Sequence, residues 1–172
     1  MPRVNRAMRQ IMDWRAAVIA GLLAGVLALA LRVLLWVLVT GGSFWAPFYQ
    51  SAAIFLGPES LAPVDAPQMG VVAVGVLVHM ALSLVYALLL AFIIHRWGLI
   101  VGILGGALFG LAIYVINYYT FTYLFPWFFP LRSWLVLATH VFFGATAGGI
   151  YEALERHIYV LDEPPSKSRL PA

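Results

Sequence analysis

The sequence contains no cysteine, and only 10% of its 172 residues are charged, against roughly 25% in soluble domains. The absence of cysteine excludes disulfide bonds, thiolate metal sites and cysteine nucleophiles. Apolar residues make up 63% of the chain and the mean hydropathy is +0.95. A small soluble domain cannot bury that much apolar surface, so this composition excludes a soluble enzyme, a nucleic-acid binder and a disordered tail. It leaves an integral membrane protein.

Sequence signatures of catalysis are also missing. The chain has no phosphate-binding loop, no HExxH zinc motif and no GxSxG nucleophile elbow. Acidic residues are absent from the interiors of the long apolar stretches, which argues against a proton or cation transporter that depends on a buried carboxylate. We therefore expect a protein that is not an enzyme.

Four apolar stretches are long enough to cross a bilayer as helices, which takes roughly 20 residues each. Their Leu, Val, Ala and Ile content, without strand-like alternation, favours helices over a β-barrel. The predicted fold is an all-α, four-helix bundle embedded in a membrane. The predicted helices occupy residues 16–40, 69–94, 98–119 and 132–154.

These spans divide the chain into a basic N-terminal segment (1–15), a membrane domain (16–154) and a tail (155–172). The loop 41–68 is too apolar for a free aqueous loop, so we expect it to hold a short interfacial helix. The aromatic segment 121–130 is typical of a belt at headgroup depth. The end of the tail is polar and contains proline, which predicts an unfolded segment unless a partner holds it.

Basic residues predict the orientation of the chain in the membrane. If both termini share one side, that side receives eight basic residues and the other side receives Arg132. The positive-inside rule then places both termini in the cytoplasm. We expect a multi-pass protein of the bacterial inner membrane, with membrane lipids as partners and no nucleic acid. The eight residues are Arg3, Arg6, Arg9, Arg15, Arg96, Arg156, Lys167 and Arg169.

Glycines spaced four residues apart mark predicted helix-packing faces. In a membrane, small residues let helix backbones approach closely and pack by dispersion. Nearly all of these glycines fall in the predicted cytoplasmic half, so we expect the bundle to be tightest there. They also give more small-residue faces than one compact bundle needs, which favours association with other membrane subunits. The seven glycines are Gly21, Gly25, Gly102, Gly106, Gly110, Gly144 and Gly148.

A pattern shared by two halves of the chain suggests an internal repeat. Residues 21–27 and 102–108 both read Gly-x-Leu-x-Gly-x-Leu. Each run leads to an aromatic, proline-containing segment and then to a helix with a histidine in its first half, His79 or His140. This arrangement predicts two duplicated helical hairpins related by an axis along the membrane normal.

Six polar side chains within or beside the apolar stretches are predicted to share one layer, roughly 10–15 Å below the outer surface at ~1.5 Å per residue. A buried arginine costs roughly 2.5–3.5 kcal/mol on insertion scales, so its guanidinium needs partners. For Arg32 we consider snorkelling toward lipid phosphates, a structural hydrogen-bond network, and a site for an anionic ligand. The six residues are Arg32, His79, Tyr114, Asn117, Tyr118 and His140.

The two deep histidines leave several interpretations open. Opposed imidazoles in a helical bundle can ligate a haem iron axially, and Arg32 would then meet a propionate. A quinone-type headgroup is a second candidate. A neutral His79 or His140 that only bonds to a neighbouring helix is the common structural case.

Three segments resemble a group of small, uncharacterised bacterial inner-membrane proteins sometimes labelled YagU-like. They are GGALFGLAIYVINYYTFT (105–122), FPWF (125–128) and HVFFG (140–144). Tyr-x-x-Asn and Phe-Pro-Trp are the more specific pieces, and the resemblance covers residues 15 to about 155. It implies a four-helix inner-membrane protein without an established activity, and it transfers no catalytic residues.

Together these patterns favour a non-catalytic accessory subunit of a larger membrane complex, with an energy-transducing complex as the expected host. The first alternative is an electron-transfer protein that binds haem b or a quinone at His79 and His140. The second is a small transporter or channel with an outward-facing cup at Arg32.

Overall fold

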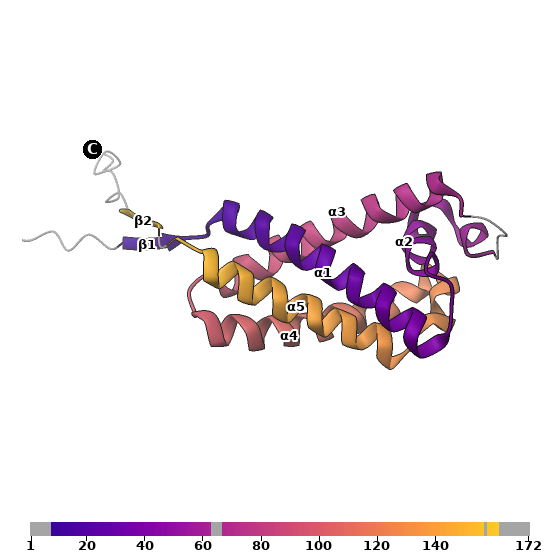
Figure 1. The fold of residues 1–172 in the computed structure, drawn as a ribbon. Coiled ribbons are helices and arrows are strands. Elements are labelled where there is room, and N and C mark those ends of the chain that lie inside the picture. Colours follow the sequence, from indigo (N-terminus) through magenta and orange to yellow (C-terminus); the bar gives the residue numbers. More distant parts are fainter. Residues whose placement is uncertain (1–7, 63–66, 157, 162–172) are drawn as a thin grey trace, which may run out of the picture.

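A computed structural model describes residues 8–62, 67–156 and 158–161 of the chain. Its four long helices pack side by side in an elongated bundle (Figure 1), and each is long and apolar enough to cross a membrane. This confirms the predicted all-α four-helix membrane bundle. The helices are α1 (Trp14–Thr40), α3 (Met69–Ile94), α4 (Leu99–Val115) and α5 (Trp134–Leu154).

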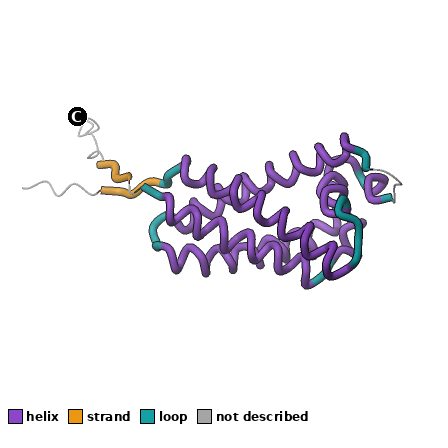
Figure 2. Tube along the Cα trace, viewed as in Figure 1, coloured by secondary structure: helices purple, strands orange, loops and turns teal. Residues whose placement is uncertain are grey.

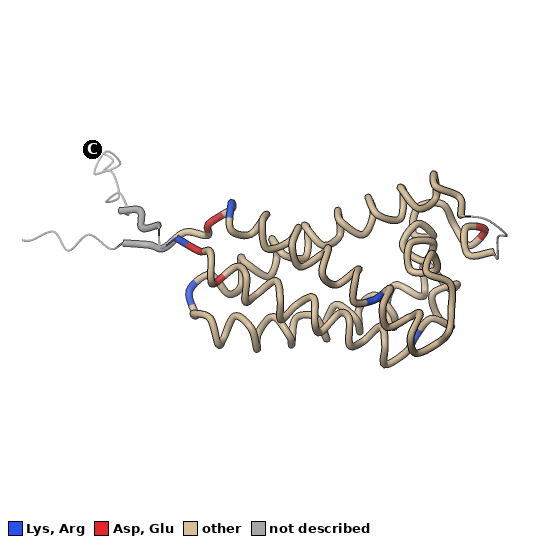
Figure 3. The backbone as a smooth tube through the Cα atoms, viewed as in Figure 1, with Lys and Arg blue, Asp and Glu red and all other residues tan. Residues whose placement is uncertain are grey.

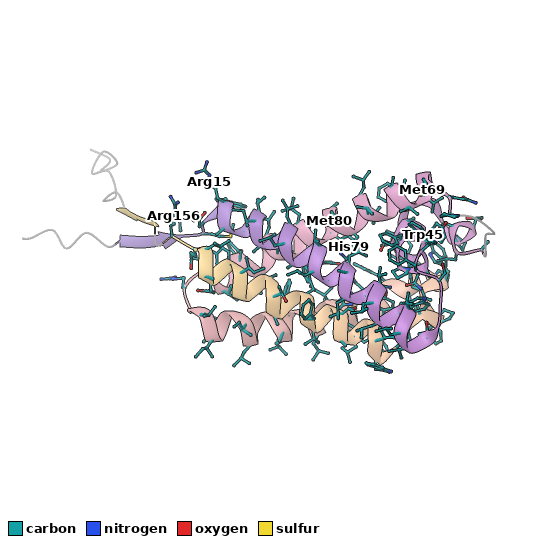
Figure 4. All side chains as sticks on the ribbon, viewed as in Figure 1. Arg15, Trp45, Met69, His79, Met80 and Arg156 are labelled. Atoms are coloured by element: carbon teal, nitrogen blue, oxygen red, sulfur yellow. The ribbon has the colours of Figure 1, made fainter. Side chains whose placement is uncertain are left out.

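Helix α1 packs against both α3 and α5, and α4 packs closely along α5, whereas α3 and α4 share few contacts. The start of α1 and the end of α5 lie together at one end of the bundle (Figure 1). We call this the terminal end, marked by Arg15 and Arg156 in Figure 4, and the opposite end, near Trp45 and Met69, the α2 end. Whether the α1–α3 and α4–α5 pairs arose by duplication stays a prediction.

Local sequence signals set the helix limits. The Asp13 carboxylate accepts hydrogen bonds from the first turn of α1, and the Ser133 hydroxyl accepts one from the Val136 N–H at the start of α5, which are ordinary N-cap arrangements. Helix α1 ends at Gly41, whose φ of 65° is a left-handed conformation that glycine adopts without strain.

All seven predicted packing glycines lie at contacts between helices of this chain. On α4, a methyl group on Gly106 would collide with the Gly144 carbonyl oxygen of α5, and Gly102 and Gly110 meet the carbonyls of Gly148 and His140. Gly21 and Gly25 of α1 lie against α3, where Cβ atoms built on them would come within 3 Å of the Ala87 and Ser83 side chains. These small-residue faces are therefore used inside the bundle.

The segment between the first two spans holds α2 (Ala46–Leu56) and a short 3-10 helix, η1 (Pro58–Leu61). Helix α2 lies across the α2 end of the bundle (Figure 1). It approaches α3 where Gly75 faces the Phe48 carbonyl, and Gln50 is among its buried residues. One face of α2 is buried against the end of the bundle. That this helix lies at the membrane interface stays a prediction.

Helix α4 continues directly into irregular helical turns before α5 begins. They are a π-helical turn, η2 (Ile116–Thr120), and two 3-10 segments, η3 (Phe121–Tyr123) and η4 (Pro126–Leu131). The predicted helix 98–119 is thus an α-helix that widens near its end. Part of the predicted aromatic segment packs on the bundle, where Phe128 is buried, whereas Tyr123 and Leu124 are 87% and 70% exposed.

The terminal end carries a pair of strands that the sequence analysis did not predict. Strand β1 (Met8–Ile11) pairs antiparallel with β2 (Ile158–Leu161), with Ile11 opposite Ile158. Figure 2 shows this two-stranded ribbon beyond the ends of the helices. The remaining predictions for residues 1–7 and 162–172 fall outside the described residues.

Charged residues are few along the described part of the bundle and lie mostly toward its two ends (Figure 3). Large apolar side chains such as Leu38, Leu77, Ile100 and Leu108 are about 70% exposed. In water such a surface would be unstable, whereas it is suited to contact with acyl chains.

The interior contains two separate clusters of buried apolar side chains. The larger one occupies the terminal half and is built from small residues of α1 together with Leu90, Ile94 and Tyr151. The smaller one lies near the α2 end and includes Tyr118 and Phe128. The candidate functional site lies between them.

Candidate functional site

A cavity of about 220 Å³ separates the two apolar clusters, and all five α-helices contribute to its wall. It is larger than an engineered cavity of roughly 150 Å³ that takes up benzene. Polar side chains from every one of these elements or their extensions reach it. They are Arg32 from α1, Gln50 and Ser51 from α2, His79, Ser83 and Tyr86 from α3, Asn117 and Tyr118 from η2, and Thr139 and His140 from α5.

Arg32 is the charged group of this cavity. Its side chain is 8% exposed, and its Nη2 donates to Gln50 Oε1 at 2.7 Å and to the Tyr118 hydroxyl at 3.4 Å. The Arg32 Nε is buried and has no hydrogen-bond partner. The described lining residues include no Asp or Glu, so neutral groups alone hold the guanidinium.

This geometry distinguishes the interpretations considered for Arg32. A snorkelling arginine extends its head to the membrane surface, whereas Arg32 is buried and bonded to side chains of α2 and η2. The structure therefore favours an internal network. Because the Arg32 Nε–H lies beside a cavity without a hydrogen-bond partner, the network is also compatible with an anionic ligand that would accept from this N–H.

The two deep histidines both line the cavity, and each is bonded to a backbone carbonyl. His79 Nε2 donates to Gly25 O of α1 at 3.0 Å, and His140 Nδ1 donates to Val136 O of its own helix at 2.8 Å. Because a carbonyl only accepts, the bonded nitrogen carries a proton. In the neutral ring the other nitrogen remains an acceptor. Figure 4 shows His79 between the labelled residues of the two ends.

The π-helical turn brings Asn117 and Tyr118 to the cavity together. π turns occur frequently at functional sites because they interrupt regular helix geometry. The Tyr86 hydroxyl of α3 donates to Asn117 Oδ1 at 3.0 Å. The Asn117 amide N–H groups and the Tyr118 hydroxyl proton are donors that a ligand in the cavity could use.

Tyr114 is the predicted site residue that does not line the cavity. Its ring stacks on Tyr118 at 5.3 Å between centroids and contacts the edge of His140 at 5.8 Å. It therefore supports the site from behind. Arg132, which in the sequence indicated only membrane topology, stabilises the same turn by donating to Tyr118 O and Thr122 Oγ1.

Haem b does not fit between His79 and His140. The cavity lies below the roughly 300–1,000 Å³ of typical small-molecule pockets, and a porphyrin is a large ligand. Both Tyr114 and Tyr118 contact the His140 ring at centroid distances of 5.8 and 5.7 Å. The fit fails on these contacts and on volume.

Several cavity residues were not identified from the sequence. Gln50 is the most important, because it holds the Arg32 guanidinium. An amide in an otherwise apolar short helix was an available signal, but its partner depends on how α2 folds back. Ser83 and Thr139 lie within predicted spans, where single hydroxyl residues carry little information.

A second polar cluster, at the terminal end, has a structural role. The Asp13 N–H donates to the buried Tyr151 hydroxyl at 3.4 Å, and that hydroxyl donates to Glu155 Oε1 at 2.9 Å. Asp13 Oδ2 also accepts from the Arg156 N–H at 3.2 Å. These bonds join the start of α1 to the end of α5.

The carboxylate form of Asp13 is favoured by this arrangement. Burial alone would raise the pKa of its carboxyl, but the backbone N–H groups of Ala16, Arg156 and Arg15 outweigh burial and hold the pKa below its ordinary value. This acid contributes to joining the helix ends and lies far along α1 from the cavity.

Within the described residues, no group of three or more His, Cys, Asp or Glu side chains is arranged to hold a metal ion. Comparison with models of known protein families, with curated proteins and with solved structures finds no match. The cavity must therefore be interpreted from its own geometry.

Proposed function

We propose that this chain is a binding protein of the membrane that holds an anionic oxygen group, a carboxylate or a phosphate, beside Arg32. The observation that carries the proposal is a buried guanidinium that faces a cavity, has an unpaired Nε and has no acidic residue among the described lining residues. A cation buried in a membrane domain is costly unless a counter-charge accompanies it.

The residues around the cavity have distinct roles in this proposal. Arg32 supplies the charge, and Gln50 and Tyr118 fix its orientation through the bonds to Nη2. Its Nε–H is the donor that an anionic oxygen would accept, and hydrogen bonds to charged groups contribute about 1.5–3 kcal/mol. Asn117 can donate to a second oxygen. We infer binding without chemistry, since this set is suited to holding an anion.

A neutral headgroup is less well supported. A quinone offers carbonyl acceptors to the same donors, but it leaves the Arg32 charge without a counter-charge. The anion is therefore the preferred occupant, and the experiment includes a neutral arm to separate the two.

Thermal unfolding of the purified full chain in dodecyl maltoside tests the proposal. Butyrate and butyl phosphate should raise the unfolding midpoint of the wild type, because a ligand that binds only the folded state stabilises it by mass action. Neutral butyramide should not. Arg32→Gln should remove the response to both anions, and Arg32→Lys, which keeps the charge, should retain part of it.

The outcome does not depend on a damaged fold. An uncompensated buried charge is costly and Arg32→Gln removes it, so this variant should unfold at a midpoint no lower than the wild type without ligand. An equal response to butyramide and butyrate, or an unchanged response in Arg32→Gln, would refute an anion site at Arg32.

For location, we propose a bacterial inner-membrane protein with both termini in the cytoplasm. The support is the distribution of charge along the bundle. Arg15, Arg96 and Arg156 lie at the terminal end or beside it, and the positive-inside rule assigns such an end to the cytoplasm. The cavity would then lie in the half of the membrane that faces the periplasm.

The accessory-subunit hypothesis stays a prediction, and its main argument is now weaker. Faces rich in glycine suggested unsatisfied contacts, but those glycines pack within the chain. The channel alternative is disfavoured by the close packing of the terminal half, where Ala17, Ala24 and Leu90 are at most 1% exposed. The resemblance to the YagU-like group also stays a prediction.

A further inference from the structure

The most exposed residue of the cavity's described lining, Phe121, lies on the side between α3 and α4. Lining residues on α1, such as Ala28 and Arg32, are buried. On the α3–α4 side, Leu82, Tyr86 and Asn117 are only half-buried. Phe121, which follows the π turn, is 43% exposed. The cavity therefore opens sideways.

The separation of the two helices explains this opening. Helices α3 and α4 approach each other near the loop that joins them, where a Cβ built on Gly105 would lie 3.8 Å from Ile94 Cγ2. Farther along they share few contacts. There the long Tyr86 side chain reaches across to Asn117. One hydrogen bond of this kind is a weak closure, worth about 0.5–1.5 kcal/mol net.

The opening faces the apolar surface of the bundle. Val85 and Leu89 on α3 and Leu108 on α4 are each at least half exposed, and both helices are long and apolar enough to cross a membrane. A molecule that enters between α3 and α4 therefore comes from among acyl chains. An anion does not reach that region without an apolar tail.

Building on the proposed anion site, we propose that its ligand is an acyl amphiphile, which enters from the bilayer between α3 and α4. Its carboxylate or phosphate head lies at Arg32, and its tail leaves the cavity past Leu82 and Phe121. The cavity volume of about 220 Å³ accommodates a headgroup and a few carbons, so most of the tail remains in the gap and in the surrounding lipid.

Photo-crosslinking tests the path of the tail. The probe is palmitate with a diazirine in mid-chain, added to the full chain in dodecyl maltoside micelles, and the crosslinked residues are identified by mass spectrometry. Crosslinks should concentrate on Leu82, Tyr86 and Phe121. Laurate and dodecyl phosphate should compete, whereas methyl laurate should not. Arg32→Gln should remove these crosslinks.

A pair of matched variants tests the gap itself. Leu82→Trp adds bulk at the opening and should lower crosslinking by about tenfold, the change that 1.4 kcal/mol produces. Leu77→Trp adds the same side chain to α3 about 140° around the helix from Leu82, where Leu77 is 68% exposed and lies outside the cavity lining, and it should leave crosslinking unchanged. Unfolding midpoints without ligand show whether both variants fold.

The arms of the experiment separate this inference from the anion site. If butyrate and butyl phosphate stabilise the wild type through Arg32 but crosslinks scatter over the outer faces of α1 and α5, the anion site stands and lateral entry of an amphiphile is wrong. If neither the short anions nor the probe depends on Arg32, both proposals fail. Equal competition by methyl laurate would refute the requirement for a charged head.

Discussion

The contact between α4 and α5 permits a stringent test, because two adjacent glycines have opposite surroundings. A Cβ on Gly106 would collide with the Gly144 carbonyl oxygen and lie 2.8 Å from its carbonyl carbon. A Cβ on Gly105 would have Ile94 Cγ2 as its nearest neighbour, at 3.8 Å, which is ordinary van der Waals contact. Gly106→Ala and Gly105→Ala therefore introduce the same atom on the same helix.

The magnitude follows from this comparison. Both variants gain roughly 1 kcal/mol of helix propensity when glycine becomes alanine, so this term cancels between them. The difference is the cost of the collision, which for an overpacked contact is about 1–3 kcal/mol. The upper part of that range is expected, because a backbone carbonyl cannot move away as a flexible side chain does. The two helices would have to separate along their length.

The measurement is reversible unfolding in mixed dodecyl maltoside and sodium dodecyl sulfate micelles, followed by far-ultraviolet circular dichroism. Gly105→Ala should unfold at or above the wild-type midpoint and Gly106→Ala clearly below it. If the two variants unfold at the same midpoint, the close backbone contact between α4 and α5 is wrong, and with it the interpretation of the glycine pattern.

Two further predictions concern the ends of the bundle. The folded-state pKa of Asp13 lies below its unfolded value of about 3.9. Its charge therefore stabilises the fold above that value, and this contribution is lost as pH falls through the folded-state pKa. Asp13→Asn, which still caps α1, should be less stable than the wild type at pH 7, and this difference in stability should disappear below about pH 4. A difference that persists in acid would show that the carboxylate charge is not the source. Because the chain has no cysteine, single-cysteine variants test topology directly: an impermeant maleimide should label Glu59→Cys in intact spheroplasts and Arg96→Cys only after the membrane is opened. The reverse labelling would contradict cytoplasmic termini.

The fold was largely predictable because one physical requirement governs it. A bilayer requires long apolar helices whose backbone groups are satisfied internally. Such helices are visible in the sequence as long apolar runs, such as residues 69–94, which form α3. The glycine spacing likewise identified contacts such as Gly106 with Gly144. What the spacing could not reveal was whether the partner helix belongs to this chain or to another.

The candidate site was predictable only in part. Arg32, His79 and His140 stand out because polar groups are rare within membrane spans, and the structure brings all three to one cavity. Gln50 and Tyr86 were missed because their roles depend on the direction of α2 and on the gap beside α3. Those arrangements arise from tertiary packing and leave no periodic signal.

The ribbon β1–β2 could not be expected from four-residue segments that lie about 150 positions apart. Pairing of such short segments is marginal by itself, and here the bonds from Asp13 to Tyr151 and Arg156 hold their bases together. The Asp13 side chain caps α1, and its second role, toward α5, depends on tertiary packing.

The pairing of Met8 with Leu161 has a practical consequence for fusion proteins. Complementary halves of a split reporter, fused before Met8 and after Leu161, would be tethered to paired residues and would reassemble within a single molecule. Signal from such a doubly tagged chain would arise within one molecule and not from a complex, so a search for partner proteins should tag one end only.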